Sequence, residues 1–293
     1  MGRRAVRVLE SSFEGVGGVQ IFRRAWTPEH FDAPEPEPRA IVVLVHGAGE
    51  HSGRYEHVAE TLTRAGLVVH ALDHRGHGRS DGPRALIDRA AHAIADLERL
   101  VSLTREEHAA APLFVLGHSM GAMLTLGWAA SHGERAAGLV LSGALAELPD
   151  VPAPLALIGR ALSALAPTAP LIAIDPELVS RDPAVVAAYR SDPLVHHGRL
   201  PARTAAEIED TVRRLPQTVG AIETPALIMY GTADDLCPPS GSVMVAERIA
   251  SADVTVRAYE GLFHEILNEP ERELVLEDLL GWISARIPAR AEA

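Results

Sequence analysis

Short runs of apolar residues alternate along this chain with longer stretches in which apolar positions recur at helical spacing. The run at 41–46, IVVLVH, is rich in β-branched residues, as is typical of strands buried on both faces of a sheet. The spacing of apolar residues over 86–108 predicts a long amphipathic helix. Further strands are expected at 19–25, as part of an N-terminal hairpin, and at 67–73, 113–116, 138–142, 225–230 and 253–259, with helices at 122–130 and from 270 to about 285. This alternation predicts the α/β class, with a mostly parallel central sheet and helices on both faces.

The alternation stops between residues 144 and 218. This stretch has many prolines and an apolar run at 153–166 with one arginine, Arg160. We interpret it as a cap inserted into a core formed by 1–143 and 219–293. An apolar cover over a polar site implies an apolar substrate, because such a surface is unfavourable to expose. The alternative is that 153–166 is an ordinary internal helix. Residues 28–39, with their PEPEP repeat, predict a surface connection.

Charge and composition narrow the range of partners and compartments. The 293 residues include 39 acidic residues against 27 basic ones, all arginine, and the formal net charge of −12 argues against nucleic acid and against strong binding to anionic lipid. The single cysteine, Cys237, excludes an intrachain disulfide and is expected to be a small buried apolar residue. No apolar run approaches the length of about 18 residues that a membrane span needs. No secretory signal is visible, so a cytoplasmic location is expected.

The most informative motif follows the apolar run at 113–116. Gly117, His118, Ser119, Met120 and Gly121 form G-x-S-x-G between a predicted strand and a predicted helix, which is the context of a nucleophile elbow. So sharp a turn has no room for side chains two residues before and after the serine, which explains the two glycines. The backbone N–H of Met120 begins the helix and is expected to stabilise an oxyanion.

A nucleophilic serine needs a base, an acid and a second oxyanion donor. The H-G turn after the 41–46 strand assigns the N–H of Ala48 as that donor, although its glycines could serve the turn alone. His264 is expected as the base because it lies in a loop between the last strand and the last helix. Two aspartates after the 225–230 strand, Asp234 and Asp235, compete for the role of the acid. The order serine, aspartate, histidine predicts ester hydrolysis through an acyl-enzyme.

Two polar loops lie beside this predicted site. The loop at 73–82, DHRGHGRSDG, has the composition of a metal site but lacks a recognised ligand spacing, so we favour a hydrogen-bonded scaffold. No metal site is therefore expected in this loop. Glu50, His51 and Arg54 follow the H-G turn beside the predicted pocket, and Glu50 with Arg54 could equally be an ion pair at a helix start.

Six sequence blocks resemble the monoacylglycerol lipases, most closely the actinobacterial type: HGAGEHSGRYEHVA, ALDHRGHGRSDG, GHSMGA, SDPLVHHGR, GTADDLC and YEGLFHE. The resemblance implies an α/β-hydrolase fold with a cap, release of a fatty acid and glycerol, and no cofactor. It also implies that Asp234 is the catalytic acid, that Glu50 and Arg54 line the polar end where glycerol sits, and that Tyr189 belongs to the cap region of the binding site.

Two departures and three alternatives accompany the resemblance. Ala122 stands where the family usually has a third glycine, and Leu267 stands where mammalian members carry a second histidine, so glycerol recognition could differ. A broader carboxylesterase or lysophospholipase would have the same three residues. A hydrolase-fold binding protein would lack turnover, and epoxide hydrolases and dehalogenases would need an aspartate in place of Ser119. The expected partner is a lipid ester, met at a membrane or lipid interface through the cap. The sequence does not indicate an oligomeric state.

Overall fold

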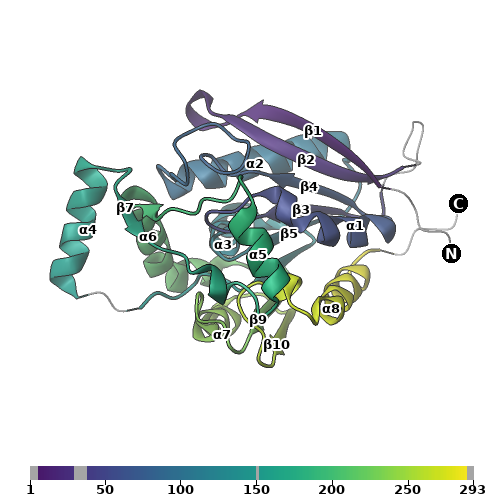
Figure 1. Cartoon of the computed structure of the whole chain (residues 1–293). Helices are drawn as coiled ribbons and strands as arrows, with labels where there is room; N and C mark the ends of the chain where they lie inside the picture. Colours follow the sequence, from purple (N-terminus) through teal and green to yellow (C-terminus); the bar gives the residue numbers. More distant parts are fainter. Residues whose placement is uncertain (1–5, 30–37, 150–151, 289–293) are drawn as a thin grey trace, which may run out of the picture.

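The computed structural model describes residues 6–29, 38–149 and 152–288, in which strands and helices alternate along most of the chain (Figure 1). The strands are β1 (Val6–Glu14), β2 (Gln20–Pro28), β3 (Ile41–Val45), β4 (Val68–Leu72), β5 (Leu113–His118), β6 (Gly138–Ser142), β7 (Pro170–Ile172), β8 (Leu200–Pro201), β9 (Ala226–Gly231) and β10 (Val254–Tyr259). The helices are α1 (Glu56–Arg64), α2 (Ala90–Glu107), α3 (Met120–His132), α4 (Ala153–Leu165), α5 (Pro183–Ser191), α6 (Ala202–Thr218), α7 (Pro239–Arg248) and α8 (Arg272–Ser284).

An eight-stranded sheet forms the centre of the molecule, in the order β1-β2-β4-β3-β5-β6-β9-β10. The N-terminal hairpin pairs β1 with β2, and β2 pairs antiparallel with β4, while every later pairing is parallel. The predicted mostly parallel sheet is therefore confirmed. Because parallel strands end at the same edge, the loops after β3, β5, β9 and β10 can meet around one site.

Two apolar clusters pack on the two faces of this sheet. Side chains of α2 and α3 join alternate residues of β3 and β5 on one face, and those of α1 and α8 join the other residues of the same strands on the opposite face. All five residues of β3 are fully buried, as its β-branched composition predicts. The prediction of helices on both faces is confirmed.

Several boundaries differ from those predicted. The helix expected from residue 86 begins at Ala90, because residues 83–86 form turns in which Ala85 adopts a φ of 56°. Helices α1 and α7 were not predicted, and neither was the two-stranded sheet of β7 and β8. The predicted connection at 28–39 lies largely outside the described residues.

The 144–218 segment contributes α4, α5, α6 and the small β7–β8 sheet. Helix α6 is the most firmly attached, because Ile208, Val212 and Leu215 join the core cluster that contains α2 and α3. Helix α4 stands at the outer edge of the molecule (Figure 1). Among the described residues, no helix is both long and apolar enough to cross a membrane.

Candidate active site

Ser119 lies at the turn between β5 and α3 with φ 54° and ψ −122°, a backbone conformation that residues other than glycine rarely adopt. The flanking glycines make the turn possible. A Cβ on Gly117 would lie 2.6 Å from the carbonyl oxygen of Gly121, and a Cβ on Gly121 would lie 2.1 Å from that of Val45. The strained backbone directs the Ser119 side chain toward the cavity described below, and it is partly exposed there.

Two backbone N–H groups lie beside this serine. Met120 is the first residue of α3, so its N–H has no partner within the helix. The H-G turn after β3 comes close as well, because a Cβ on Gly47 would lie 3.1 Å from the Cβ of Ser119. In the described part of the chain, the amide of Ala48 donates no hydrogen bond. Both amides are therefore available to an oxygen atom bound near Ser119.

His264 and Asp234 meet at the same edge of the sheet, where the loops after β10 and β9 end. The Nδ1 atom of His264 lies 2.8 Å from Oδ2 of Asp234. The other carboxylate oxygen accepts the backbone N–H groups of Leu236 and Cys237 at 2.9 and 2.8 Å. Asp235 is exposed, whereas Asp234 is only 3% exposed. Of the two competing aspartates, Asp234 alone is bonded to His264.

The ionisation of His264 is set by opposing effects. Burial lowers its pKa, but Cys237 and the Asp234 carboxylate raise it, and the pKa lies well above its ordinary value. His118 lies beside it, with ring centroids 4.6 Å apart. Burial and the neighbouring His264 lower the pKa of His118 to about 3, so this second imidazole stays neutral.

Cys237 is buried, as expected, but its surroundings were not predicted. Its Sγ atom lies 3.8 Å from Oγ of Ser119. Its backbone N–H holds Asp234, which explains why a residue three positions after the aspartate reaches the serine. Among the described hydrogen bonds, Ser119 Oγ pairs with this thiol and not with His264.

A buried network joins the H-G turn to the His264 loop. Oε1 of Glu50 accepts the N–H of Gly47 and the hydroxyl of Tyr55, both at 2.6 Å. Oε2 of Glu50 accepts Arg54 at 2.8 Å, and Arg54 also donates to both carboxylate oxygens of Glu265. The ion pair between Glu50 and Arg54, which the sequence analysis left as an alternative, is thus present as one half of a larger cluster. Removing Arg54 would leave two buried carboxylates facing each other, a loss of about 3–5 kcal/mol.

Other contacts attach the 144–218 segment to the loop after β3. The imidazole of His51 lies 2.8 Å from Oδ2 of Asp192, and the N–H of His196 donates to the carbonyl of Gly49 at 2.7 Å. The ring of Tyr189 stacks under the guanidinium of Arg54, whose Cζ is 4.7 Å from the ring centroid.

The 73–82 loop is hydrogen-bonded to the loop that follows β3. Asp73 accepts the N–H groups of Ser52 and Arg79 at 2.8 Å each. His46 Nε2 accepts the N–H of His74 at 2.9 Å. This loop is therefore a hydrogen-bonded scaffold, as favoured from its sequence.

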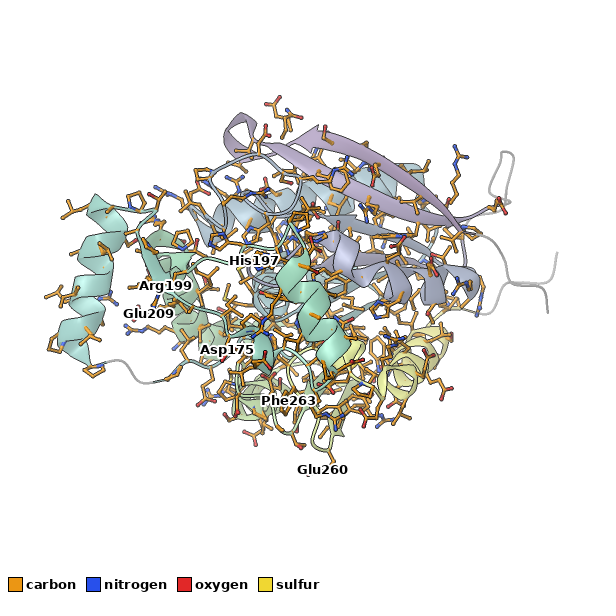
Figure 2. The ribbon with its side chains drawn as sticks, in the orientation of Figure 1. Asp175, His197, Arg199, Glu209, Glu260 and Phe263 are labelled. Carbon is orange, nitrogen blue, oxygen red and sulfur yellow. The ribbon has the colours of Figure 1, made fainter. Side chains whose placement is uncertain are left out.

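A cavity of about 620 Å³ opens above Ser119. Ser119, His264, Glu50 and Tyr189 line it together with apolar side chains of the 144–218 segment: Leu145, Leu148, Leu155, Ile158, Leu171, Ile172, Ile174, Leu200 and Ile208. Figure 2 shows Arg199 and Glu209 on the side where α4 stands, and Glu209 also lines the cavity. Leu267 does not line this cavity and packs in the core cluster with α1 and α8.

Comparisons with known proteins agree with this architecture. A family model described as serine aminopeptidase, S33, matches residues 36–271. A monoacylglycerol lipase of Mycolicibacterium smegmatis is 43% identical over 279 residues, which cover 95% of this chain and 98% of that protein. Human monoglyceride lipase is 33% identical over 273 residues, 92% of this chain and 88% of its own. The crystal structure of a Paleococcus ferrophilus monoacylglycerol lipase superimposes with a TM-score of 0.78 at 30% identity, covering 96% of this chain and 99% of that one.

Proposed function

The chain belongs to the monoacylglycerol lipase family of serine α/β-hydrolases, and from that premise we propose that it cleaves monoacylglycerols to a free fatty acid and glycerol by means of Ser119, His264 and Asp234. Carboxylic ester hydrolysis is the activity of the family, and the chain is a carboxylic ester hydrolase. The observation that carries the assignment of residues is the 2.8 Å bond between His264 and Asp234, in a cavity that Ser119 also lines.

In the proposed mechanism, Ser119 attacks the ester carbonyl while His264 removes the proton of its hydroxyl. The same imidazole then protonates the departing glycerol oxygen, which leaves an acyl-enzyme. Water, deprotonated by His264, attacks the acyl group and releases the fatty acid. Asp234 keeps Nδ1 of the imidazole protonated and stabilises its charged form, because its carboxylate accepts that hydrogen.

The N–H groups of Ala48 and Met120 are proposed to stabilise the negative oxygen that forms during each attack. Removal of one such donor from a hydrolase typically raises the barrier by about 3 kcal/mol. The hydrogen bond from Gly47 to Glu50 fixes the turn that carries Ala48, and Arg54 joins that turn to the residue after His264. We therefore assign Glu50 and Arg54 a positioning role in addition to their place at the polar end of the site.

Ser119 must rotate to reach His264, because its hydroxyl lies against the thiol of Cys237. A rotation about one side-chain bond is a small change, and nucleophile and base often draw together only when substrate is bound. Rotation would exchange the weak contact with sulfur for a hydrogen bond to nitrogen.

The substrate class follows from the lining of the cavity. Apolar side chains of the 144–218 segment suit an acyl chain, whereas Glu50 and Tyr189 stand at the end nearest the H-G turn and suit the glycerol hydroxyls. We propose that 144–218 acts as the cap, with 1–143 and 219–293 as the core. Leu157 and Leu165 of α4 are 68% and 86% exposed, which supports transient contact of the cap with a lipid surface.

The decisive experiment is covalent labelling with a fluorophosphonate, followed by mass spectrometric mapping. Label on Ser119, with loss of both label and activity in Ser119→Ala, is the expected result. Retained esterase activity in that variant would refute the mechanism. Asp234→Asn should lower kcat by about 10⁴-fold, as removal of the acid does in other hydrolases, and Asp235→Asn should leave it nearly unchanged. A larger loss in Asp235→Asn than in Asp234→Asn would show that Asp235, not Asp234, is the catalytic acid.

Substrate class is tested separately with monoacylglycerols of increasing chain length, lysophospholipids and soluble p-nitrophenyl esters. We expect the highest kcat/KM with monoacylglycerols. A clear preference for lysophospholipids would contradict the substrate while leaving the mechanism of ester hydrolysis intact.

A further inference from the structure

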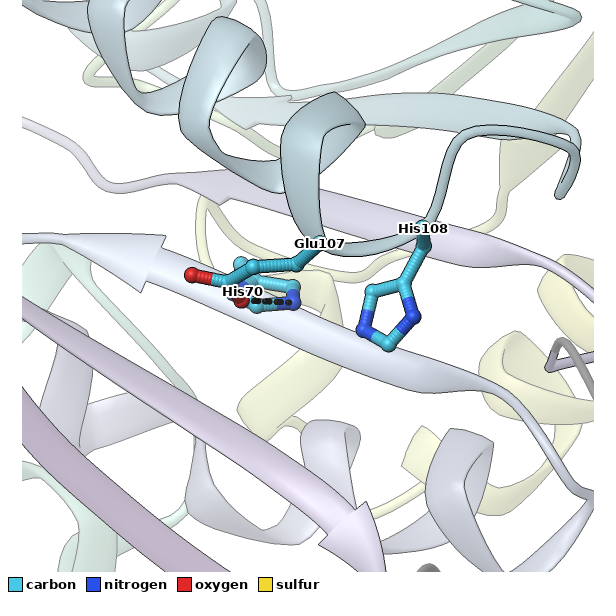
Figure 3. Close-up of side chains that lie close together, drawn as sticks. All are labelled: His70, Glu107 and His108. Atoms are coloured by element: carbon cyan, nitrogen blue, oxygen red, sulfur yellow. Dashed lines mark ion pairs between the residues drawn. The ribbon is translucent and has the colours of Figure 1, made fainter. Parts of the chain in front are cut away.

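We propose that His70, Glu107 and His108 bind one divalent transition-metal ion, of the kind that imidazole and carboxylate ligands hold, at the junction of β4 and the end of α2 (Figure 3). None of these residues takes part in the proposed ester hydrolysis, and none lines the cavity above Ser119. The inference is therefore independent of the proposed function.

The three side chains converge from separate elements. His70 lies in the middle of β4, opposite Ala25 of β2 and Val43 of β3. Glu107 ends α2 and His108 caps it. One ligand atom from each residue lies within 4.8 Å of the other two, and Nε2 of His70 is 3.9 Å from Oε2 of Glu107. Ligand atoms around a tetrahedral zinc ion are about 3.3 Å apart, so binding requires the side chains to close by roughly 1 Å.

His70 provides a second, independent observation. Its side chain is only 2% exposed, and within the described residues neither ring nitrogen has a hydrogen-bond partner. Buried polar groups are normally paired, so an unpaired imidazole facing a carboxylate and a second imidazole needs an explanation.

The local electrostatics both favour and oppose a cation. Glu107 contributes a negative charge, and the end of α2 adds the negative pole of the helix dipole. Arg23 opposes the ion, since its Nη2 lies 2.7 Å from Oε1 of Glu107. The same contact has a useful consequence, because it orients the carboxylate and leaves Oε2 facing His70.

A metal here would be structural. It would join the strand next to the N-terminal hairpin to the long helix on the same face of the sheet, and the partly exposed Glu107 and His108 leave room for a water molecule as a fourth ligand. The expectation from sequence that no metal is bound rested on the 73–82 loop. It did not consider these three residues, because nothing in their spacing indicates that a strand and a helix end meet.

The test uses the full chain without an added histidine tag, freed of metal by a chelator. Calorimetric titration with Zn²⁺ should give one ion per chain and raise the Tm, and Co²⁺ should give the intense visible absorption of a low-coordinate site. His108→Ala and Glu107→Gln should each weaken binding by more than about 100-fold, because loss of a ligand exceeds the effect of losing a supporting contact. Both side chains are partly exposed, so we expect the metal-free variants to keep the wild-type Tm.

Two control variants make the result specific. His92→Ala removes a histidine whose Nδ1 lies 2.6 Å from Oδ2 of Asp88 but which has no third ligand among the residues that the structure describes. This variant should bind metal like the wild type. Ser119→Ala should also bind metal normally while losing esterase activity. The proposal is overturned if the wild type shows no saturable binding, if His108→Ala binds as well as the wild type, or if His92→Ala loses the ion.

Discussion

Helices α3 and α4 are each thirteen residues long and each rich in apolar side chains, yet they occupy opposite environments (Figure 1). Helix α3 follows the turn at Ser119 and runs through the core, with nine of its residues buried. Helix α4 stands at the edge of the molecule, and Ser163 is its only buried side chain among those described. Leu155, Leu157, Ile158 and Leu165 of α4 are each more than half exposed.

The difference shows that apolar composition alone does not determine where a helix lies. Helix α3 is held by the strand before it, by a glycine that lets its first turn touch β3, and by α2 and α6 on its outer side. Helix α4 has α6 as its main neighbour, and one of its faces lines the cavity while another meets solvent. Apolar surface exposed in this way is usually reserved for a binding partner.

The largest expected difference comes from matched glycine substitutions. Gly121→Ala in α3 would place a methyl group 2.1 Å from the carbonyl oxygen of Val45, so β3 and α3 must separate. We expect a loss of about 3 kcal/mol of stability and at least about 100-fold in kcat, because the elbow shifts. Gly159→Ala in α4 meets no atom within 4 Å and should stabilise by up to about 1 kcal/mol. Chemical denaturation and esterase assays measure both, and equal effects would contradict the comparison.

Leucine truncations give the next largest contrast. Leu124 of α3 is fully buried, and Leu124→Ala should lower the free energy of unfolding by about 2–5 kcal/mol. Leu157 of α4 is 68% exposed, and Leu157→Ala should change it by less than about 0.5 kcal/mol. Urea denaturation of the two variants tests this directly. A large loss in Leu157→Ala would mean that α4 packs against the rest of the protein in solution.

The sequence predicted the surroundings of α3 better than those of α4. The parallel strands of the central sheet were predicted to within a few residues, because buried parallel strands are rich in β-branched residues, as at 41–46. The burial of α3 could be inferred from the motif before it. The position of α4 could not, because an apolar run of that length is equally compatible with an internal helix.

In the candidate site, the three central residues could be predicted from the sequence, but the residues that contact them could not. Ser119 and His264 were selected by motif and order, and Asp234 by the resemblance to the monoacylglycerol lipases. The structure brings Asp234 rather than Asp235 to His264. The neighbours of these residues were not foreseen. Cys237 contacts Ser119 and Glu265 holds Arg54 only because separate loops meet at one sheet edge, and sequence spacing carries no trace of such contacts.

Ester hydrolysis at the Ser119 site and lipid binding by α4 should also differ in their dependence on pH. His264 must be neutral to act as a base, and because Cys237 and Asp234 outweigh burial, its pKa lies above 6.5. We expect kcat/KM to rise about tenfold per pH unit up to that pKa, and the rise to move to lower pH in Asp234→Asn. The linked stability has the opposite sign, since it is complete below the unfolded pKa and is lost as the pH rises through the folded one.

Binding to lipid should not follow this profile, because Arg160 is the only ionisable residue of α4. Sedimentation of the protein with vesicles at several pH values is the measurement. Binding that rises in parallel with kcat/KM would assign the pH effect to the surface rather than to His264.

The smallest expected effect concerns the exposed face of α4. Leu157 and Leu165 do not line the cavity, so replacing both with serine should leave the hydrolysis of soluble p-nitrophenyl esters unchanged. Insertion of the two leucines into a lipid surface would remove apolar area from water. Without this contribution, vesicle binding and the hydrolysis of dispersed monoacylglycerol should each fall by roughly tenfold. Leu274→Ser is the matched control, because this leucine is 54% exposed but belongs to α8, outside the 144–218 segment. Equal losses in the control would show that any exposed leucine suffices, whereas an unaffected double variant would leave α4 without a role at the interface.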